Sequence, residues 1–129
     1  MRLSRDRLRG VLAGKVEAIS GQKLSSCYQC GKCSAGCPLE DAMDILPHRV
    51  VRDLQLGREE AALAAGAIWL CAACHTCAAR CPRGVDLSRI MEALRVIRLR
   101  RGLGPPGQAD LPDEVPQQLV VSFLRKYVG

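Results

Sequence analysis

Aromatic residues are scarce in this chain of 129 residues, in which Tyr28, Trp69, Phe123 and Tyr127 are the only four. Such a chain can build only a thin organic core, and small scaffolds with thin cores usually depend on metal sites or disulfides. The scarcity also argues against nucleic-acid binding, which prefers basic stripes interleaved with aromatic side chains on which bases stack.

Long apolar runs are also missing. The longest run covers residues 61–70, too short to cross a membrane, and it favours a buried helix. The amino terminus is basic but lacks the apolar stretch of a secretory signal, so we expect no such leader.

Cysteine, by contrast, is abundant, and one pattern accounts for all of it. Two copies of C-x2-C-x2-C-x3-C, each followed by proline, use all eight cysteines. This is the run of bacterial ferredoxins, in which three closely spaced thiolates hold one [4Fe–4S] cube and the fourth ligates the other cube. No cysteine is left for a nucleophile or a disulfide, so the pattern predicts an electron carrier. The copies are Cys27, Cys30, Cys33 and Cys37 before Pro38, and Cys71, Cys74, Cys77 and Cys81 before Pro82.

The ferredoxin rule predicts two crossed ligand sets, which would hold two [4Fe–4S] clusters side by side as an electron relay requires. We also expect the two clusters to differ in reduction potential, because one loop carries Lys32 and the other His75 and Arg80. Residue type alone does not give the order of the potentials. Cluster one is expected on Cys27, Cys30, Cys33 and Cys81, and cluster two on Cys71, Cys74, Cys77 and Cys37.

Other cysteine chemistries fit this pattern less well. Structural zinc uses paired CxxC knuckles, and a third cysteine at the same spacing followed by Cys-Pro departs from that arrangement. A zinc-stapled binding module is therefore the weaker alternative. Residues 71–75 also match the C-x-x-C-H string of c-type haem attachment, but that motif leaves Cys77 and Cys81 unexplained. A disulfide scaffold fits less well still, because no secretory signal precedes the cysteines and the chain is not of the small secreted type. Eight thiolates committed to iron would indicate a reducing, cytoplasmic location. Without its clusters we expect the chain to be largely unfolded.

The formal net charge is +6 with the cysteines counted as neutral. Two oxidised cubes with four thiolates each would lower the charge to about +2. The basic side chains fit docking to acidic partner surfaces and plain solubility equally well.

Helical periodicity recurs along the chain, and no stretch alternates with period two, so the fold is predicted to be all-α. The last helix could clamp a partner protein or fold back on its own core, and the pattern favours neither. Helices are expected at 4–20 with Ser4 as N-cap, from Pro47 to Gly57, at 58–69, from the N-cap Asp86 to Gly102, and at 117–127. The first of these helices would have one apolar face, and the helix after Asp86 an apolar stripe. The expected face is Leu8, Val11, Leu12, Val16 and Ile19, and the expected stripe is Leu87, Ile90, Met91, Leu94 and Ile97. The predicted organisation is an N-terminal helix and lead-in (1–26), a helical two-cluster ferredoxin domain (27–101), a Pro/Gly linker (102–116) and an amphipathic C-terminal helix (117–129).

Several spaced motifs accompany the cysteines. They are the cysteine run at 27–38, Met-Asp-Ile-Leu-Pro at 43–47, Leu-Gly at 56–57, Ile-Trp-Leu-Cys at 68–71 and Cys-Pro-Arg-Gly-Val-Asp at 81–86. Together these motifs resemble the small iron–sulfur C subunit of heterodisulfide reductase over about residues 11–100. The tail from residue 103 matches nothing in that family that we can identify.

This resemblance implies a small α-helical ferredoxin subunit that binds two [4Fe–4S] clusters through the eight cysteines. It further implies that electrons pass from the flavin-containing A subunit of a heterodisulfide reductase-like complex, through the two clusters, to the catalytic B subunit, which performs the disulfide chemistry. The Cys-Cys-Gly motif of the catalytic partner is missing here, so no catalytic residue and no activity of the isolated chain are expected. A free two-cluster ferredoxin, or the iron–sulfur relay of another dehydrogenase complex, is the alternative. The sequence does not distinguish heterodisulfide reduction, sulfur oxidation and electron transfer in sulfate reducers.

Overall fold

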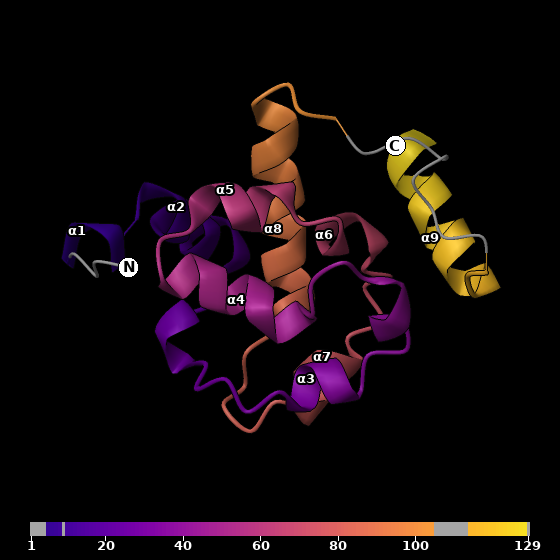
Figure 1. Cartoon of the computed structure of the whole chain (residues 1–129), viewed down its shortest axis with the longest axis horizontal. Helices are drawn as coiled ribbons and strands as arrows, with labels where there is room; N and C mark the ends of the chain where they lie inside the picture. Colours follow the sequence, from indigo (N-terminus) through magenta and orange to yellow (C-terminus); the bar gives the residue numbers. More distant parts are fainter. Residues whose placement is uncertain (1–4, 9, 105–113, 129) are drawn as a thin grey trace.

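The computed structural model describes residues 5–8, 10–104 and 114–128, and these residues form helices and no strand, as predicted (Figure 1). Two of the elements, η1 and η2, are short 3-10 helices, and the others are α-helices. In chain order they are α1 (Arg5–Leu8), α2 (Val11–Ser20), η1 (Leu24–Ser26), α3 (Lys32–Ala35), η2 (Glu40–Ala42), α4 (Pro47–Gln55), α5 (Glu59–Ala64), α6 (Ala67–Leu70), α7 (Thr76–Arg80), α8 (Leu87–Arg100) and α9 (Gln117–Val128).

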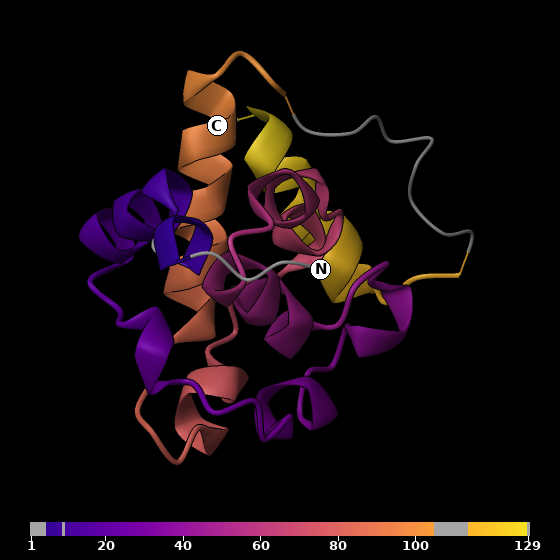
Figure 2. The same cartoon turned by 60° about the vertical axis from the view of Figure 1, so that its left-hand side comes forward.

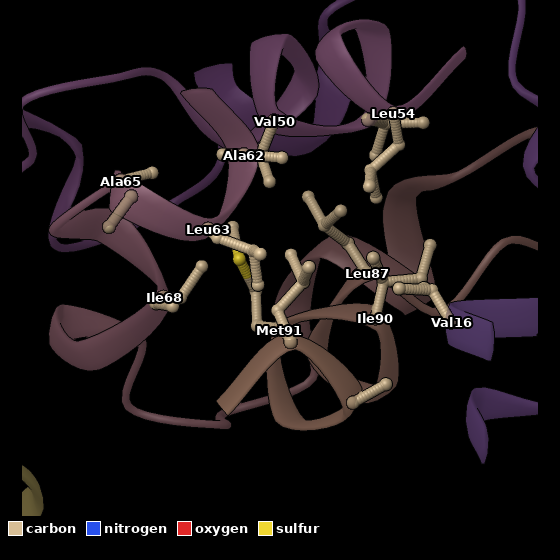
Figure 3. Close-up of a cluster of buried hydrophobic side chains, with 14 of the residues drawn as sticks. Val16, Val50, Leu54, Ala62, Leu63, Ala65, Ile68, Leu87, Ile90 and Met91 are labelled. Carbon is tan, nitrogen blue, oxygen red and sulfur yellow. The ribbon is translucent and has the colours of Figure 1, made fainter. Parts of the chain in front are cut away.

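Helix α8 lies at the centre of the core. The Asp86 side chain accepts a hydrogen bond from Arg89 N at 3.3 Å, which confirms the predicted N-cap. One face of α8 packs against α2, α5 and α6 (Figure 3). Its predicted apolar stripe is buried throughout: Leu87, Ile90, Met91, Leu94 and Ile97.

Helix α4 confirms the expected start at Pro47, where a residue without an N–H fits the first helical position. Val50, Val51 and Leu54 are buried and face the core, and α4 packs against α5. Gly57 follows with a φ of 70° and turns the chain into α5.

The prediction of one continuous helix over 4–20 is wrong. The chain leaves helical geometry at Gly10, whose ψ is 147°, so that α1 and α2 are separate. The expected N-cap, Ser4, lies outside the described residues. Leu12 and Val16 are buried against α8, but Val11 is 71% exposed, because only the row of residues four apart faces the core.

The single helix predicted over 58–69 is also wrong. Ala65 has a ψ of 122°, so α5 ends before it and α6 begins anew at Ala67. The Asp44 carboxylate accepts hydrogen bonds from Gly66 N at 2.8 Å and Ala67 N at 2.9 Å. A distant carboxylate thus caps the start of α6, and this contact explains why the helix breaks there.

The C-terminal helix folds back on the chain's own core, which is one of the two arrangements that the sequence left open. Leu119 and Phe123 are buried, and α9 packs beside α6 (Figure 1). Val121 remains 50% exposed on the outer face. Most of the predicted linker, residues 105–113, lies outside the described residues, as does the side chain of Tyr127.

Both cysteine runs lie at one end of this helical core. Figures 1 and 2 show α3 and α7, the short helices within the two runs, side by side below α4 and α8. The fold therefore brings together two segments that are far apart in sequence.

Candidate metal centre

The two cysteine loops adopt the same unusual backbone pattern. In each run, the residue just before the second cysteine and the residue just after it have positive φ angles. These residues are Gln29 (64°) and Gly31 (78°) in the first run, and Ala73 (55°) and His75 (60°) in the second. Positive φ is costly for residues other than glycine and marks a constrained, functional segment. Alternating right- and left-handed residues turn backbone N–H groups inward, which is how many iron–sulfur sites are cradled.

All four cysteines predicted for cluster two line one cavity. These are Cys37 from the first run and Cys71, Cys74 and Cys77 from the second. Burial raises the pKa of the Cys37 thiol, a backbone hydrogen bond from Leu39 lowers it, and the three cysteines of the second run raise it further. Four thiolates gathered in this way repel one another, and a positively charged iron core would relieve that repulsion.

Tyr28 lies beside two of the cysteines predicted for cluster one. Desolvation and then the charge of Cys30 and of Cys81 raise the pKa of the Tyr28 hydroxyl, and Arg83 lowers it. Tyr28 therefore lies near Cys30 of the first run and Cys81 of the second. The Cys81 sulfur also accepts a hydrogen bond from Val85 N at 3.3 Å.

Cys33 lies between the two groups. It lines the cavity of the second group. Burial raises the pKa of its thiol, hydrogen bonds from Ser34 lower it, and Cys27 and Cys77 raise it. The structure thus places cysteines of both runs side by side, and one cavity is lined by Cys33 together with the four cysteines predicted for cluster two.

Each run presents one cysteine to solvent. All eight cysteines are free thiols, and Cys30 and Cys74 are exposed whereas the other six are half-buried. These two residues hold the same position, the second, in their runs. An exposed ligand is a natural place for an electron to enter or leave a buried cluster.

The donor set matches iron–sulfur chemistry. Soft thiolate ligands suit iron–sulfur clusters, whereas hard ions prefer oxygen. In the part of the chain that the structure describes, no three histidine, cysteine or carboxylate side chains converge tightly enough to hold a single metal ion. A [4Fe–4S] cube takes one cysteine thiolate at each of its four irons, and so suits four thiolates that surround a wider space.

One contact at the start of the second cysteine run was not predicted from the sequence. The Lys126 ammonium on α9 donates hydrogen bonds to the carbonyl oxygens of Trp69 and Cys71, the latter at 2.5 Å. Burial and the nearby Arg95 lower the pKa of Lys126 to about 8, although Cys71 acts in the opposite direction. No sequence pattern links a lysine in a terminal helix to a cysteine so far away.

Residues 26–86 match the family model described as a 4Fe-4S dicluster domain. The chain contains a 4Fe-4S dicluster domain. With eight cysteines in two repeated runs, this domain fits two [4Fe–4S] clusters.

Curated relatives of the dicluster domain bear out the resemblance found in the sequence. The chain is 35% identical over 92 residues to the C subunit of the ferredoxin:CoB-CoM heterodisulfide reductase of Methanosarcina mazei, covering 71% of this chain and 56% of the relative. It is 34% identical to the iron-sulfur C subunit of the CoB–CoM heterodisulfide reductase of Methanopyrus kandleri, with 61% and 41% covered. It is 28% identical over 122 residues to the C subunit of the H(2):CoB-CoM heterodisulfide,ferredoxin reductase of Methanothermobacter thermautotrophicus, with 89% and 66% covered.

The matched region therefore spans 41–66% of the length of these relatives. The similarity supports an iron–sulfur electron-transfer protein of the kind found in heterodisulfide reductases. Among the described residues, no helix is both long enough and apolar enough to span a membrane.

Proposed function

We propose that this chain is the electron-relay subunit of a heterodisulfide reductase-like complex. In this proposal it passes single electrons between the flavin-containing subunit of that complex and the catalytic subunit, which carries out disulfide chemistry. The observation that carries the proposal is the pair of cysteine loops with the same backbone pattern, side by side on α3 and α7. When bound, the two clusters would supply reversible one-electron storage, with no bond made or broken in the protein.

The proposal assigns each ligand by the crossed pairing. The shared cavity supports the second set, and the position of Tyr28 near Cys30 and Cys81 supports the first. Cluster one is assigned to Cys27, Cys30, Cys33 and Cys81, and cluster two to Cys71, Cys74, Cys77 and Cys37.

The exposed cysteines support a relay between two partners. Through the exposed Cys30, cluster one would exchange electrons with one partner, and through the exposed Cys74, cluster two would exchange electrons with the other. The chain keeps no further cysteine for disulfide chemistry, so that reaction belongs to the catalytic partner. We also propose a cytoplasmic location, since thiolates that bind iron need a reducing compartment.

The proposal is tested by purifying the whole chain anaerobically and measuring iron, acid-labile sulfide and zinc, together with electron paramagnetic resonance spectra. We expect about eight irons and eight sulfides per chain and signals that appear on reduction. Zinc in place of iron would leave a structural binding module instead.

The partners are tested by co-expression with flavin-containing and disulfide-active subunits of the reductase type. A stable complex that loses electron transfer when this chain is omitted is the expected result. A monomer that exchanges electrons with many acceptors and binds neither of these proteins would favour a free ferredoxin.

A further inference from the structure

The first cysteine of each run has its peptide carbonyl bound by a side chain from a later helix. In the first run, Gln55 of α4 donates from Nε2 to Leu24 O at 2.7 Å and to Cys27 O at 2.9 Å. In the second run, Lys126 of α9 donates to Trp69 O and Cys71 O. Both side chains bind the carbonyl oxygen of the first cysteine in a run, but the Gln55 amide is neutral and the Lys126 ammonium is positively charged.

The Lys126 side chain binds a carbonyl at the end of helix α6. The last carbonyls of a helix have no partner within it, and α6 is a single turn closed by Cys71 N bonding to Ala67 O. Arg95 of α8 donates from Nη1 to Ile68 O at 2.6 Å. Lys126 binds the next carbonyl and that of Cys71, so cations from two helices hold the segment that enters the second cysteine loop.

The ammonium is held in place by the packing of its helix. Leu119 and Phe123 are buried on the same side of α9, beside α6 (Figure 1). Lys126 itself is half-buried, whereas Lys32, Arg80 and His75 near the cysteine loops are exposed. Exposed charges are strongly screened by water and salt, and half-buried charges are screened much less.

We propose that Lys126 raises the reduction potential of cluster two above that of cluster one, so that the first electron to enter the chain rests on cluster two. This inference rests on the cluster assignment of the proposed function. Reduction adds one negative charge to a cluster, and a fixed positive charge beside the Cys71 peptide stabilises that state. The neutral amide of Gln55 offers the equivalent peptide of cluster one no such charge. Lys126 thus acts as a positioning residue through the Cys71 peptide, without ligating iron.

The test is a redox titration of the anaerobic holoprotein, followed by electron paramagnetic resonance. The decisive variant is Lys126→Gln, which reproduces at cluster two the neutral amide that Gln55 supplies at cluster one. We expect the higher of the two midpoint potentials to shift towards the lower one, while the lower midpoint stays unchanged. The charge-retaining variant Lys126→Arg is expected to keep the wild-type gap.

Arg125→Gln is the matched control. Arg125 is the exposed neighbour of Lys126 on the same helix, so this variant also removes one positive charge from α9. It should leave both midpoints in place. Equal shifts in Arg125→Gln and Lys126→Gln would overturn the inference, because they would show a general charge effect. No shift in Lys126→Gln, or a shift of both midpoints, would overturn it as well.

Two further measurements keep the result interpretable. Cys30→Ser and Cys74→Ser change equivalent exposed ligands, so they identify which signal belongs to which cluster. A higher midpoint that belongs to the cluster of Cys30 would contradict the inference. Iron and sulfide content distinguishes failure of the proposed function from failure of this inference. If Lys126→Gln binds both clusters but shifts neither midpoint, the relay function stands and the role of Lys126 is wrong.

Discussion

The C-terminal helix offers a quantitative test of how the fold holds together. Phe123 is 1% exposed and lies with Leu119 in the contact between α9 and α6. Replacing a buried phenylalanine by alanine costs about 3–5 kcal/mol. Helix α9 has 12 residues, and isolated helices of about that length are marginal in water, so it has little stability of its own.

We therefore expect Phe123→Ala to release α9 while α8 and its packing partners stay folded. A loss of about 3 kcal/mol raises the open population of α9 at least about a hundredfold. The measurement is hydrogen exchange by mass spectrometry on the anaerobic holoprotein, supported by tryptic cleavage after Arg125 and Lys126. The rates of hydrogen exchange and of tryptic cleavage should both rise in α9 and stay unchanged in α8.

Val121→Ala is the matched control, because Val121 lies on the same helix and is 50% exposed. Exposed substitutions away from special features usually change stability by no more than about 0.5 kcal/mol. The reasoning is refuted if Phe123→Ala leaves exchange in α9 at the rate of Val121→Ala. Equal loss of protection in α8 would also refute it, since α9 would then unfold only with the core.

Three further predictions concern the site and its supports. Cys37→Ala should remove iron from the cluster of the second cysteine run, as measured by iron content and paramagnetic resonance; selective loss of the other cluster would contradict the crossed pairing. Asp44→Asn should lower the free energy of unfolding by about 1 kcal/mol, because the amide has one oxygen where the carboxylate uses two, and one hydrogen bond to the start of α6 is lost. An unchanged denaturant midpoint would rule out that capping role. Burial and Arg49 lower the pKa of His48, against a smaller opposite effect of Glu40, so the folded state binds this proton less readily than the unfolded state. The free energy of unfolding should then fall as the pH drops below the ordinary histidine pKa of about 6.5. Denaturant unfolding at several pH values should show a smaller fall for His48→Gln than for the wild-type protein. Equal falls in the two proteins would count against this account.

The sequence predicted the parts of the fold that depend on local pattern. The stripe on α8, its N-cap at Asp86 and the start of α4 at Pro47 follow from spacing and capping preferences. The division of the 58–69 helix did not, because it depends on Asp44, a residue distant in sequence. Helical periodicity also predicted too wide an apolar face for α2, because it does not indicate which residues contact α8: Leu12 and Val16 are buried, but Val11 is exposed.

The site shows the same division. The cysteine runs name all eight candidate ligands, and the crossed pairing is a prediction that follows from their spacing. The left-handed backbone at Ala73 is not visible in the sequence, because alanine has no preference for that conformation. The carbonyl contacts of Gln55 and Lys126 join helices that no local rule connects.

The side-by-side packing of α3 and α7 also bears on how the protein is made. The two helices leave the ribosome at different times, and the neighbourhood of each depends on the other. Under the proposed crossed pairing, neither ligand set is complete until Cys81 has been synthesised, because Cys37 belongs with the second run and the first run needs Cys81 as its fourth ligand. A stalled chain that ends before the second run would carry thiols but no finished site. Cofactor insertion would thereby be reserved for chains whose whole dicluster domain has emerged, which makes metal loading a checkpoint of biogenesis.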